Sequence, residues 1–98
     1  MNKDIVEFYG TSANCGIAKE EAAELIHAIS KWERVNGFGY KTDTTREDAL
    51  ENMIHAVADC QNALDSLAYS LRLDKSAIKQ KIKEADERSE KRLYGGRA

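Results

Sequence analysis

The sequence predicts an all-α protein, and three observations carry that prediction. The 98 residues contain no proline, a third of them are charged, and Ala, Glu, Lys and Leu are prominent. These residues are good helix formers, and β-branched residues do not gather in runs. Apolar residues recur at helical spacing along the chain. We therefore expect an antiparallel bundle of three to four helices joined by short loops.

The first third of the chain predicts one short and one long helix. A short helix is expected around residues 5–9, followed by a break at Gly10-Thr11-Ser12. A long helix is then expected over 17–35, ended by Asn36-Gly37. Its core stripe, at helical spacing, is Ala18, Ala22, Leu25, Ile29 and Trp32. The adjoining line of the same helix is Glu21, Glu24, Ala28 and Lys31.

The middle of the chain predicts a helix of nearly thirty residues. Thr44 and Glu47 form a capping-box pattern at its start, and it runs to about Leu73. Its apolar stripe is Leu50, Met53, Ile54, Val57, Leu64, Ala68 and Leu71. The opposite side carries small and polar residues, namely Asn52, Ala56, Asp59, Ala63, Ser66 and Ser70. A solvent-facing side is usually richer in Lys and Glu, so we expect this side to be packed or to line a cavity.

A last helix, capped by Asp74 or Ser76, is expected to end near the Tyr94-Gly95-Gly96 segment. Its inward residues are expected to be Ile78, Ile82, Ala85 and Leu93. Residues 1–94 thus form one helical domain, and 95–98 form a flexible C-terminal tail. A chain this short buries only roughly 60–65% of its unfolded surface, so we expect oligomerisation to complete the bundle.

The charge pattern bears on the partners. Fifteen Lys and Arg against 17 Asp and Glu give a net charge of −2, which argues against a nucleic acid polymer as the partner. From residue 75 onward, however, basic residues outnumber acidic ones. They are Lys75, Lys79, Lys81, Lys83, Arg88, Lys91, Arg92 and Arg97. This segment, Lys81 and Arg88 included, is where phosphate contacts are expected, and a solvated helix face is the alternative.

The cysteines and the hydropathy pattern predict a cytoplasmic protein. Cys15 and Cys60 have no CxxC spacing and read as small buried hydrophobes in a reducing compartment. No apolar run approaches the ~18 residues of a membrane span, and the N-terminus has no signal-peptide core. No membrane partner is expected.

The stretch "EEAAEL" (20–25) places three carboxylates at the start of a helical pattern. Acidic residues in a first turn complement the helix dipole, which is one explanation for them. The other is metal binding, because Glu21 and Glu24 are three residues apart and their Cβ atoms lie about 5–6 Å from each other on a helix. Two carboxylates at that distance suit Mg²⁺, a hard cation that takes oxygen ligands.

The order of these segments resembles the MazG-like all-α nucleotide pyrophosphohydrolases. "EEAAELIHAISKWERVNG" (20–37) is similar to the EExxE helix of that family, and 57–93 is similar to its later helices. "EFYGTSANCGIAKEE" (7–21) matches the lead-in, with Asn14 where many members carry a polar amide. The resemblance covers most of the chain, and its weight comes from the order and spacing of all the helices.

The resemblance implies a Mg²⁺-dependent enzyme that releases pyrophosphate from a nucleoside triphosphate or a modified nucleotide, with Mn²⁺ as the alternative metal. It implies a homodimer or homotetramer. The implied metal ligands are Glu21, Glu24 and Asp59, with His55 as a substitute ligand, and the implied catalytic acids are Glu20 and Glu21. The candidate substrate contacts are Asn14, Lys31, Trp32, Lys81 and Arg88. Asn14 comes from the resemblance and Lys81 and Arg88 from the charge pattern, whereas Lys31, on the line of Glu24, would neutralise a phosphate or form an exposed salt bridge. Trp32, or Tyr40 in the loop, would stack on a base, and core packing is the alternative for Trp32.

One departure from the family pattern concerns catalysis. The second motif, ExxD, requires Glu at position 56, and Ala56 stands there with His55 before it. Imidazole suits Mn²⁺ better than Mg²⁺, and an ordinary exposed histidine is the alternative explanation. Neither Glu51 nor Asp48 restores the pattern, because their positions on the helix differ from that of the missing acid. Two further hypotheses therefore stand beside the enzyme, a degenerate nucleotide-binding or interaction module and a purely structural helical bundle.

Overall fold

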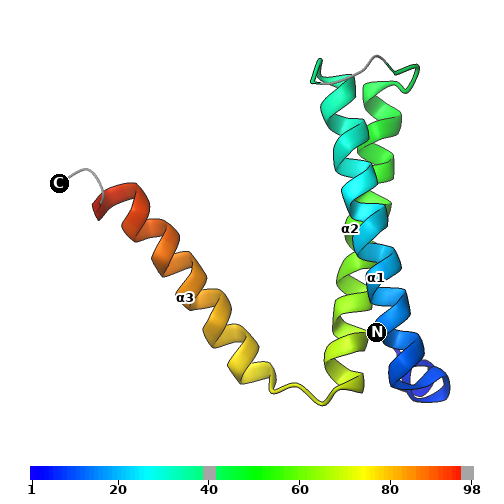
Figure 1. Ribbon diagram of the computed structural model, residues 1–98, viewed down its shortest axis with the longest axis vertical. Coiled ribbons are helices and arrows are strands. Elements are labelled where there is room, and N and C mark those ends of the chain that lie inside the picture. The colour runs from blue at the N-terminus through cyan, green and yellow to red at the C-terminus, as the bar shows by residue number, and fades with distance from the viewer. Residues whose placement is uncertain (39–41, 96–98) are drawn as a thin grey trace.

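Three helices and no strand make up the described part of the chain, residues 1–38 and 42–95 of the computed structural model. They are α1 (Lys3–Val35), α2 (Arg46–Ser70) and α3 (Lys75–Tyr94). Figure 1 shows α1 and α2 side by side as an antiparallel hairpin, with α3 leading away from it. The all-α prediction is confirmed. Tyr40 and Arg97 lie outside the described residues, as does most of the expected 95–98 tail.

α1 is kinked at Gly10. Asn2 caps its start, with the side-chain oxygen accepting from the N–H groups of Asp4 and Ile5. Gly10 has φ 82° and ψ 173°, a conformation that is essentially restricted to glycine. The expected break is therefore present, but the prediction of a helix start near residue 17 is wrong. Only Gly10 leaves helical geometry, and the helix resumes at once.

α2 begins and ends within a few residues of the predicted limits. Its N-cap is Thr45, whose hydroxyl accepts from the Asp48 N–H at 3.1 Å, so the prediction of Thr44 is wrong by one residue. At the other end the N–H of Leu73 donates to the Ala68 carbonyl and that of Arg72 to the Tyr69 carbonyl. This is the Schellman pattern, with Arg72 left-handed at φ 55°. It ends the helix at Ser70, before the predicted Leu73.

Small residues form the seam between α1 and α2. Ala49, Ala56 and Ala63 are buried along α2 at seven-residue intervals, so they repeat every two turns on one face. The buried residues of α1 are Val6, Asn14 and Ala28. Of the small-residue side of α2, which was expected to be packed or to line a cavity, Ala56 and Ala63 are packed, whereas Asn52 and Asp59 are exposed. Short side chains let the two helices approach closely.

The predicted apolar stripes lie beside this seam and are largely exposed in the single chain. On α1, Ala22 and Ile29 are exposed while Ala18, Leu25 and Trp32 are half-buried. The exposed residues of the second stripe are Leu50, Ile54, Val57 and Leu64 of α2, and Leu71 directly after it. Alanine occupies the contact between α1 and α2 instead, so the larger apolar residues of the stripes remain exposed. Cys15 and Cys60 are free and half-buried, not fully buried as expected.

α3 does not join the hairpin. Asp74 caps it through hydrogen bonds from the Ser76 and Ala77 N–H groups, which settles the choice between Asp74 and Ser76. Ile78, Ile82 and Leu93 were expected to face inward and are exposed, because no other helix of the described chain covers them. Within one chain the helices thus form a pair and a separate arm, not a bundle of three or four.

Candidate functional site

A cleft of about 530 Å³ opens between α1 and α2 on one side of the seam. α1 contributes one wall and α2 the other. The lining residues are Glu20, Glu21, Glu24, His27, Ala28, Lys31, Asn52, His55, Ala56 and Asp59. We call this the acidic cleft, because four carboxylates lie in it.

Helical spacing explains why these residues meet. Glu24 and Lys31 are seven residues apart on α1, and Asn52 and Asp59 are seven apart on α2, so each pair repeats after two turns on one wall. Ala28 and Ala56 are buried at the floor, where the helices touch. Glu21 and Glu24, predicted as one half of a metal site, therefore line the same cleft as Asp59, predicted as the other half.

The charge in the acidic cleft is unbalanced. Four carboxylates face one lysine, the half-buried Lys31. A nucleotide phosphate entering alone would meet mostly like charge. The cleft therefore suits a cation, or an anion that arrives with one.

The donors fit Mg²⁺ by their chemistry, since carboxylate oxygens are the ligands it prefers. In the described residues, however, no group of three or more His, Cys, Asp or Glu side chains lies close enough together to hold a metal ion. Binding a metal between Glu21, Glu24 and Asp59 would require these side chains to rotate toward one another. Because these side chains lie on two walls of the same cleft, such a rotation would bring their carboxylates together.

Position 56 carries no ligand. Ala56 is 7% exposed and packs in the seam, where the family pattern would have a glutamate at the cleft floor. His55 also lines the acidic cleft, and its Nε2 lies 3.4 Å from the Glu51 carboxylate on the exposed side of α2. That pairing draws the imidazole toward Glu51, which does not line the cleft.

Other predicted substrate contacts lie elsewhere. The Asn14 amide is buried and donates to the carbonyls of Val6 (3.0 Å) and Gly10 (2.7 Å), so both of its N–H groups serve the α1 kink. Trp32 is half-buried, and the Arg46 guanidinium lies over its ring at 5.4 Å from the centroid. Neither residue lines the acidic cleft.

Lys81 and Arg88 project from α3, away from the hairpin. Both are exposed, and the Lys81 ammonium lies 3.1 Å from the Glu84 carboxylate of the same helix. The structure therefore brings Lys31, but neither of these two basic residues, to the cleft within one chain. Conversely, it adds His27 to the cleft, and it places Asn52 there from the side of α2 that was expected to be packed or to line a cavity.

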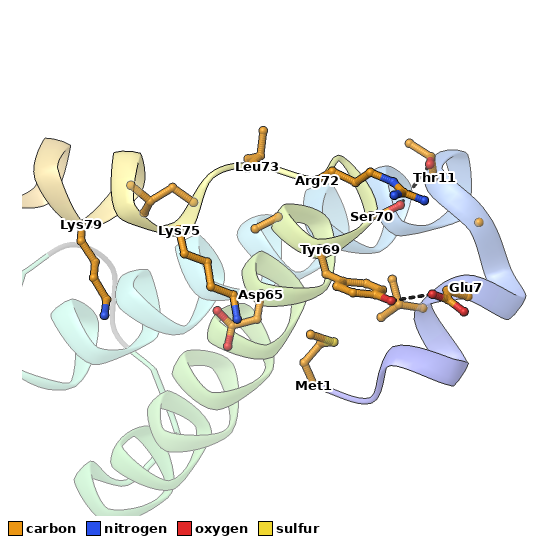
Figure 2. Close-up of a pocket in the computed structure, with 14 residues that line it drawn as sticks. Met1, Glu7, Thr11, Asp65, Tyr69, Ser70, Arg72, Leu73, Lys75 and Lys79 are labelled. Carbon is orange, nitrogen blue, oxygen red and sulfur yellow. Dashed lines mark hydrogen bonds between the residues drawn. The ribbon is translucent and has the colours of Figure 1, made fainter.

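A second cleft, of about 970 Å³, lies where the N-terminal segment meets the α2–α3 turn. Figure 2 shows the Tyr69 hydroxyl donating to the Glu7 carboxylate across this cleft. That hydrogen bond, with help from desolvation and the Glu7 charge, raises the pKa of Tyr69 above its usual value. Thr11 and Ser70 hydrogen-bond nearby at 3.0 Å. No local motif reveals these contacts, because 62 residues separate Glu7 from Tyr69.

The described part of the chain is thus all-helical, and a carboxylate-lined cleft lies between two antiparallel helices. In the described residues, no helix has the length and apolar character that crossing a membrane requires. No family model matches the chain, and no match is found among curated proteins or among solved structures.

Proposed function

We propose that the acidic cleft is the site of a Mg²⁺-dependent pyrophosphohydrolase that converts a nucleoside triphosphate, or a modified nucleotide, to its monophosphate and pyrophosphate. One observation carries the proposal. Glu21 and Glu24 of α1 line the same cleft as Asp59 of α2, as the resemblance to the MazG-like enzymes requires. Mn²⁺ is the alternative metal, because His55 lines the cleft as well.

Each residue has a role in this proposal. Glu21, Glu24 and Asp59 would hold Mg²⁺, which when bound polarises phosphate oxygens and lowers the pKa of a water. Glu20, which lines the same cleft, takes the proton of the attacking water. The oxygen of that water bonds to phosphorus, and the bond between phosphorus and the leaving phosphate oxygen breaks. Lys31 neutralises part of the phosphate charge.

Pyrophosphate release from purified protein tests the proposal. With Mg²⁺ or Mn²⁺ and a panel of NTPs and dNTPs, we expect release that Glu21→Gln or Asp59→Asn lowers by at least about 100-fold, since losing a ligand carboxylate costs several kcal/mol of transition-state stabilisation. Glu33→Gln is the matched control, because Glu33 is exposed on α1 and lies outside the cleft. Intact nucleotides across the whole panel would refute the enzyme.

Ala56 favours a second candidate, a degenerate relative that binds nucleotide or acts as an interaction module without catalysis. The residue lies at the cleft floor where the family pattern has its fourth acid. Water can replace one ligand of Mg²⁺, so binding survives the loss better than catalysis does.

Substitution at position 56 separates the two candidates. Ala56→Glu adds a carboxylate to the cleft floor, and a gain of hydrolysis would identify a lapsed site. Ala58→Glu is the control, because Ala58 is exposed on α2 and does not line the acidic cleft. A rise in melting temperature with nucleotide and metal is expected for the enzyme and for a nucleotide-binding relative, and not for a purely structural bundle.

We also propose that a homodimer or homotetramer completes the helical bundle. The support is the exposure of the apolar residues on all three helices of the single chain.

A further inference from the structure

The α1–α2 hairpin has two different sides. On α2, Leu50, Val57 and Leu64 each follow a seam alanine by one residue, about 100° around the helix, whereas Asp59 follows Ala56 by three, about 60° the other way. Because the helices are antiparallel, the corresponding flank of α1 lies on the same side. We call the side away from the acidic cleft the apolar face. Its exposed residues are Ile29, Leu50, Val57, Leu64 and Leu71.

α3 carries a stripe that matches this face. Ile78, Ile82 and Ala85 share one side of α3 and line a shallow groove of about 440 Å³ that is almost entirely apolar. The stripe from Ile78 to Leu93 is about 22 Å long, and the apolar face from Leu50 to Leu71 is about 32 Å long. A helix of this length therefore fits on the face without overhanging it.

The α2–α3 turn keeps α3 off its own hairpin. The left-handed Arg72 and the two hydrogen bonds of the Schellman pattern set the direction in which the chain leaves α2. Figure 1 shows α3 diverging from the hairpin from this point onward. Folding α3 back on α2 would break that turn. Ile78 lines the second cleft of its own chain, whereas Ile82 and Leu93, farther along the stripe, are exposed and are presented to another molecule.

We propose that α3 docks on the apolar face of a second copy of this chain, and that the second copy returns its own α3 in the same way. The exchange places two α3 helices on two hairpins. Each acidic cleft remains open on the other side, so the proposal holds whether or not the cleft hydrolyses nucleotides.

Charge complementarity selects a second copy as the occupant. α3 carries seven Lys and Arg against four Asp and Glu, a net charge of +3. Residues 1–71 carry six Lys and Arg against twelve Asp and Glu, a net charge of −6. Docking α3 on a hairpin brings opposite charges together, whereas docking one hairpin on another brings like charges together.

The buried area is sufficient for a dimer. α3 has 20 residues and is therefore about 30 Å long and about 10 Å across. Two docked copies bury roughly 1,200 Å² over both surfaces, the lower end of the range for specific interfaces. A measurable, concentration-dependent dimer is expected.

Light scattering or sedimentation of the full chain over a range of concentrations tests the proposal. We expect a wild-type dimer whose Kd rises on the order of 100-fold in Ile78→Ser/Ile82→Ser, because two apolar side chains leave each contact. Lys83→Ser/Glu87→Ser is the matched control. Both residues are exposed on the far side of α3 and their charges cancel, so its Kd should not change. Circular dichroism of each variant checks that the helices persist.

Zero-length cross-linking of mixed ¹⁵N-labelled and unlabelled wild-type chains identifies the contact without any substitution. We expect mixed-isotope links from α3 lysines to acids beside the apolar face, such as Glu33 of α1 and Glu47 of α2. Three outcomes would overturn the proposal. The chain could be a monomer, or it could give links only within one chain. It could also form a dimer that is linked only hairpin to hairpin and whose Kd does not change with the Ile78 and Ile82 substitutions. None of these readouts involves nucleotide, so they succeed or fail independently of the hydrolysis assay.

Discussion

Gly10 and Asn14 shape the N-terminal end of the hairpin. Gly10 adopts a backbone conformation that other residues rarely reach, and it interrupts the hydrogen bonds of α1. The Asn14 amide replaces part of that loss by donating to the Val6 and Gly10 carbonyls. A buried asparagine with both partners inside its own helix segment is thus a structural element here. The resemblance to a substrate-binding amide could not reveal this, because the partners are main-chain carbonyls.

Gly10→Ala is expected to destabilise the chain by about 1–3 kcal/mol, because alanine is strained at φ 82°. Gly16→Ala adds the same methyl group inside regular helix and is expected to stabilise by about 1 kcal/mol. Neither new Cβ would meet another atom within 4 Å, so backbone conformation alone separates the two. Urea unfolding of both variants measures the difference, and shifts of the same sign would contradict it.

The Tyr69–Glu7 hydrogen bond predicts a change in stability at high pH. The neutral phenol is the donor, so its contribution is fully present below the usual pKa of 10 and is lost as pH rises through the higher pKa of the folded state. Glu7→Gln is expected to lower the pKa of Tyr69 toward the usual value. Ultraviolet titration of tyrosinate, with Tyr69→Phe subtracted to isolate this group, measures it. Superimposable curves for wild type and Glu7→Gln would rule out the contact.

At the level of helices, the sequence predicts where helices form better than it predicts which of their residues contact one another. Cap residues such as Asp74 act on their immediate neighbours, so the limits of α2 and α3 follow within a few residues. The start of α1 does not follow, because the helix resumes directly after Gly10. The seam does not follow from hydrophobicity, because the buried Ala56 and Ala63 are less apolar than the exposed residues that follow them, Val57 and Leu64. Small size, and not hydrophobicity, decides which side of α2 meets α1.

Like the fold, the candidate site could be predicted from the sequence only in part. Glu21 and Glu24 are neighbours by helical spacing alone, and the pairing of their helix with the helix of Asp59 follows from a short connection. The positions of Lys81 and Arg88 did not follow, because they depend on the direction that α3 takes after Arg72. The Glu7–Tyr69 contact depends on the kink at Gly10, which no periodic pattern specifies.

Ala63→Leu is expected to destabilise the hairpin by about 1–3 kcal/mol, because the closely packed seam has no room for a larger side chain. Ala58→Leu makes the same change at an exposed position of α2 and should alter stability by less than about 0.5 kcal/mol. Chemical denaturation followed by circular dichroism compares the two. Equal stability of both variants would mean that the alanines do not form the contact.

As a whole molecule, the described chain lacks a core of its own. Its radius of gyration is 17.3 Å, whereas a compact domain of this size has one of about 13 Å. The buried apolar residues are Val6 and four alanines, and no large side chain is fully buried among the described residues. A single chain therefore buries little apolar surface, and the proposed association would add to its stability.

That dependence predicts a melting temperature that rises with protein concentration. For a dimer that dissociates on unfolding, each tenfold increase is worth about 1.4 kcal/mol, or roughly 3–5 °C for a pair of chains this size. Scanning calorimetry at several concentrations measures the slope. A constant melting temperature would mean that the isolated chain is folded and stable by itself.

The kink at Gly10 also determines how the two helices of the hairpin align lengthwise. Alanine at every seventh residue of α2 offers several equivalent positions for sliding along α1, since each shift of two turns restores a similar seam. The connection between the helices restrains one end. At the other end the kink turns the N-terminal segment so that Glu7 and Thr11 reach Tyr69 and Ser70, which a shifted hairpin would separate. The two polar contacts thus fix the lengthwise alignment of α1 and α2, and they keep Glu24 and Asp59 in the same cleft.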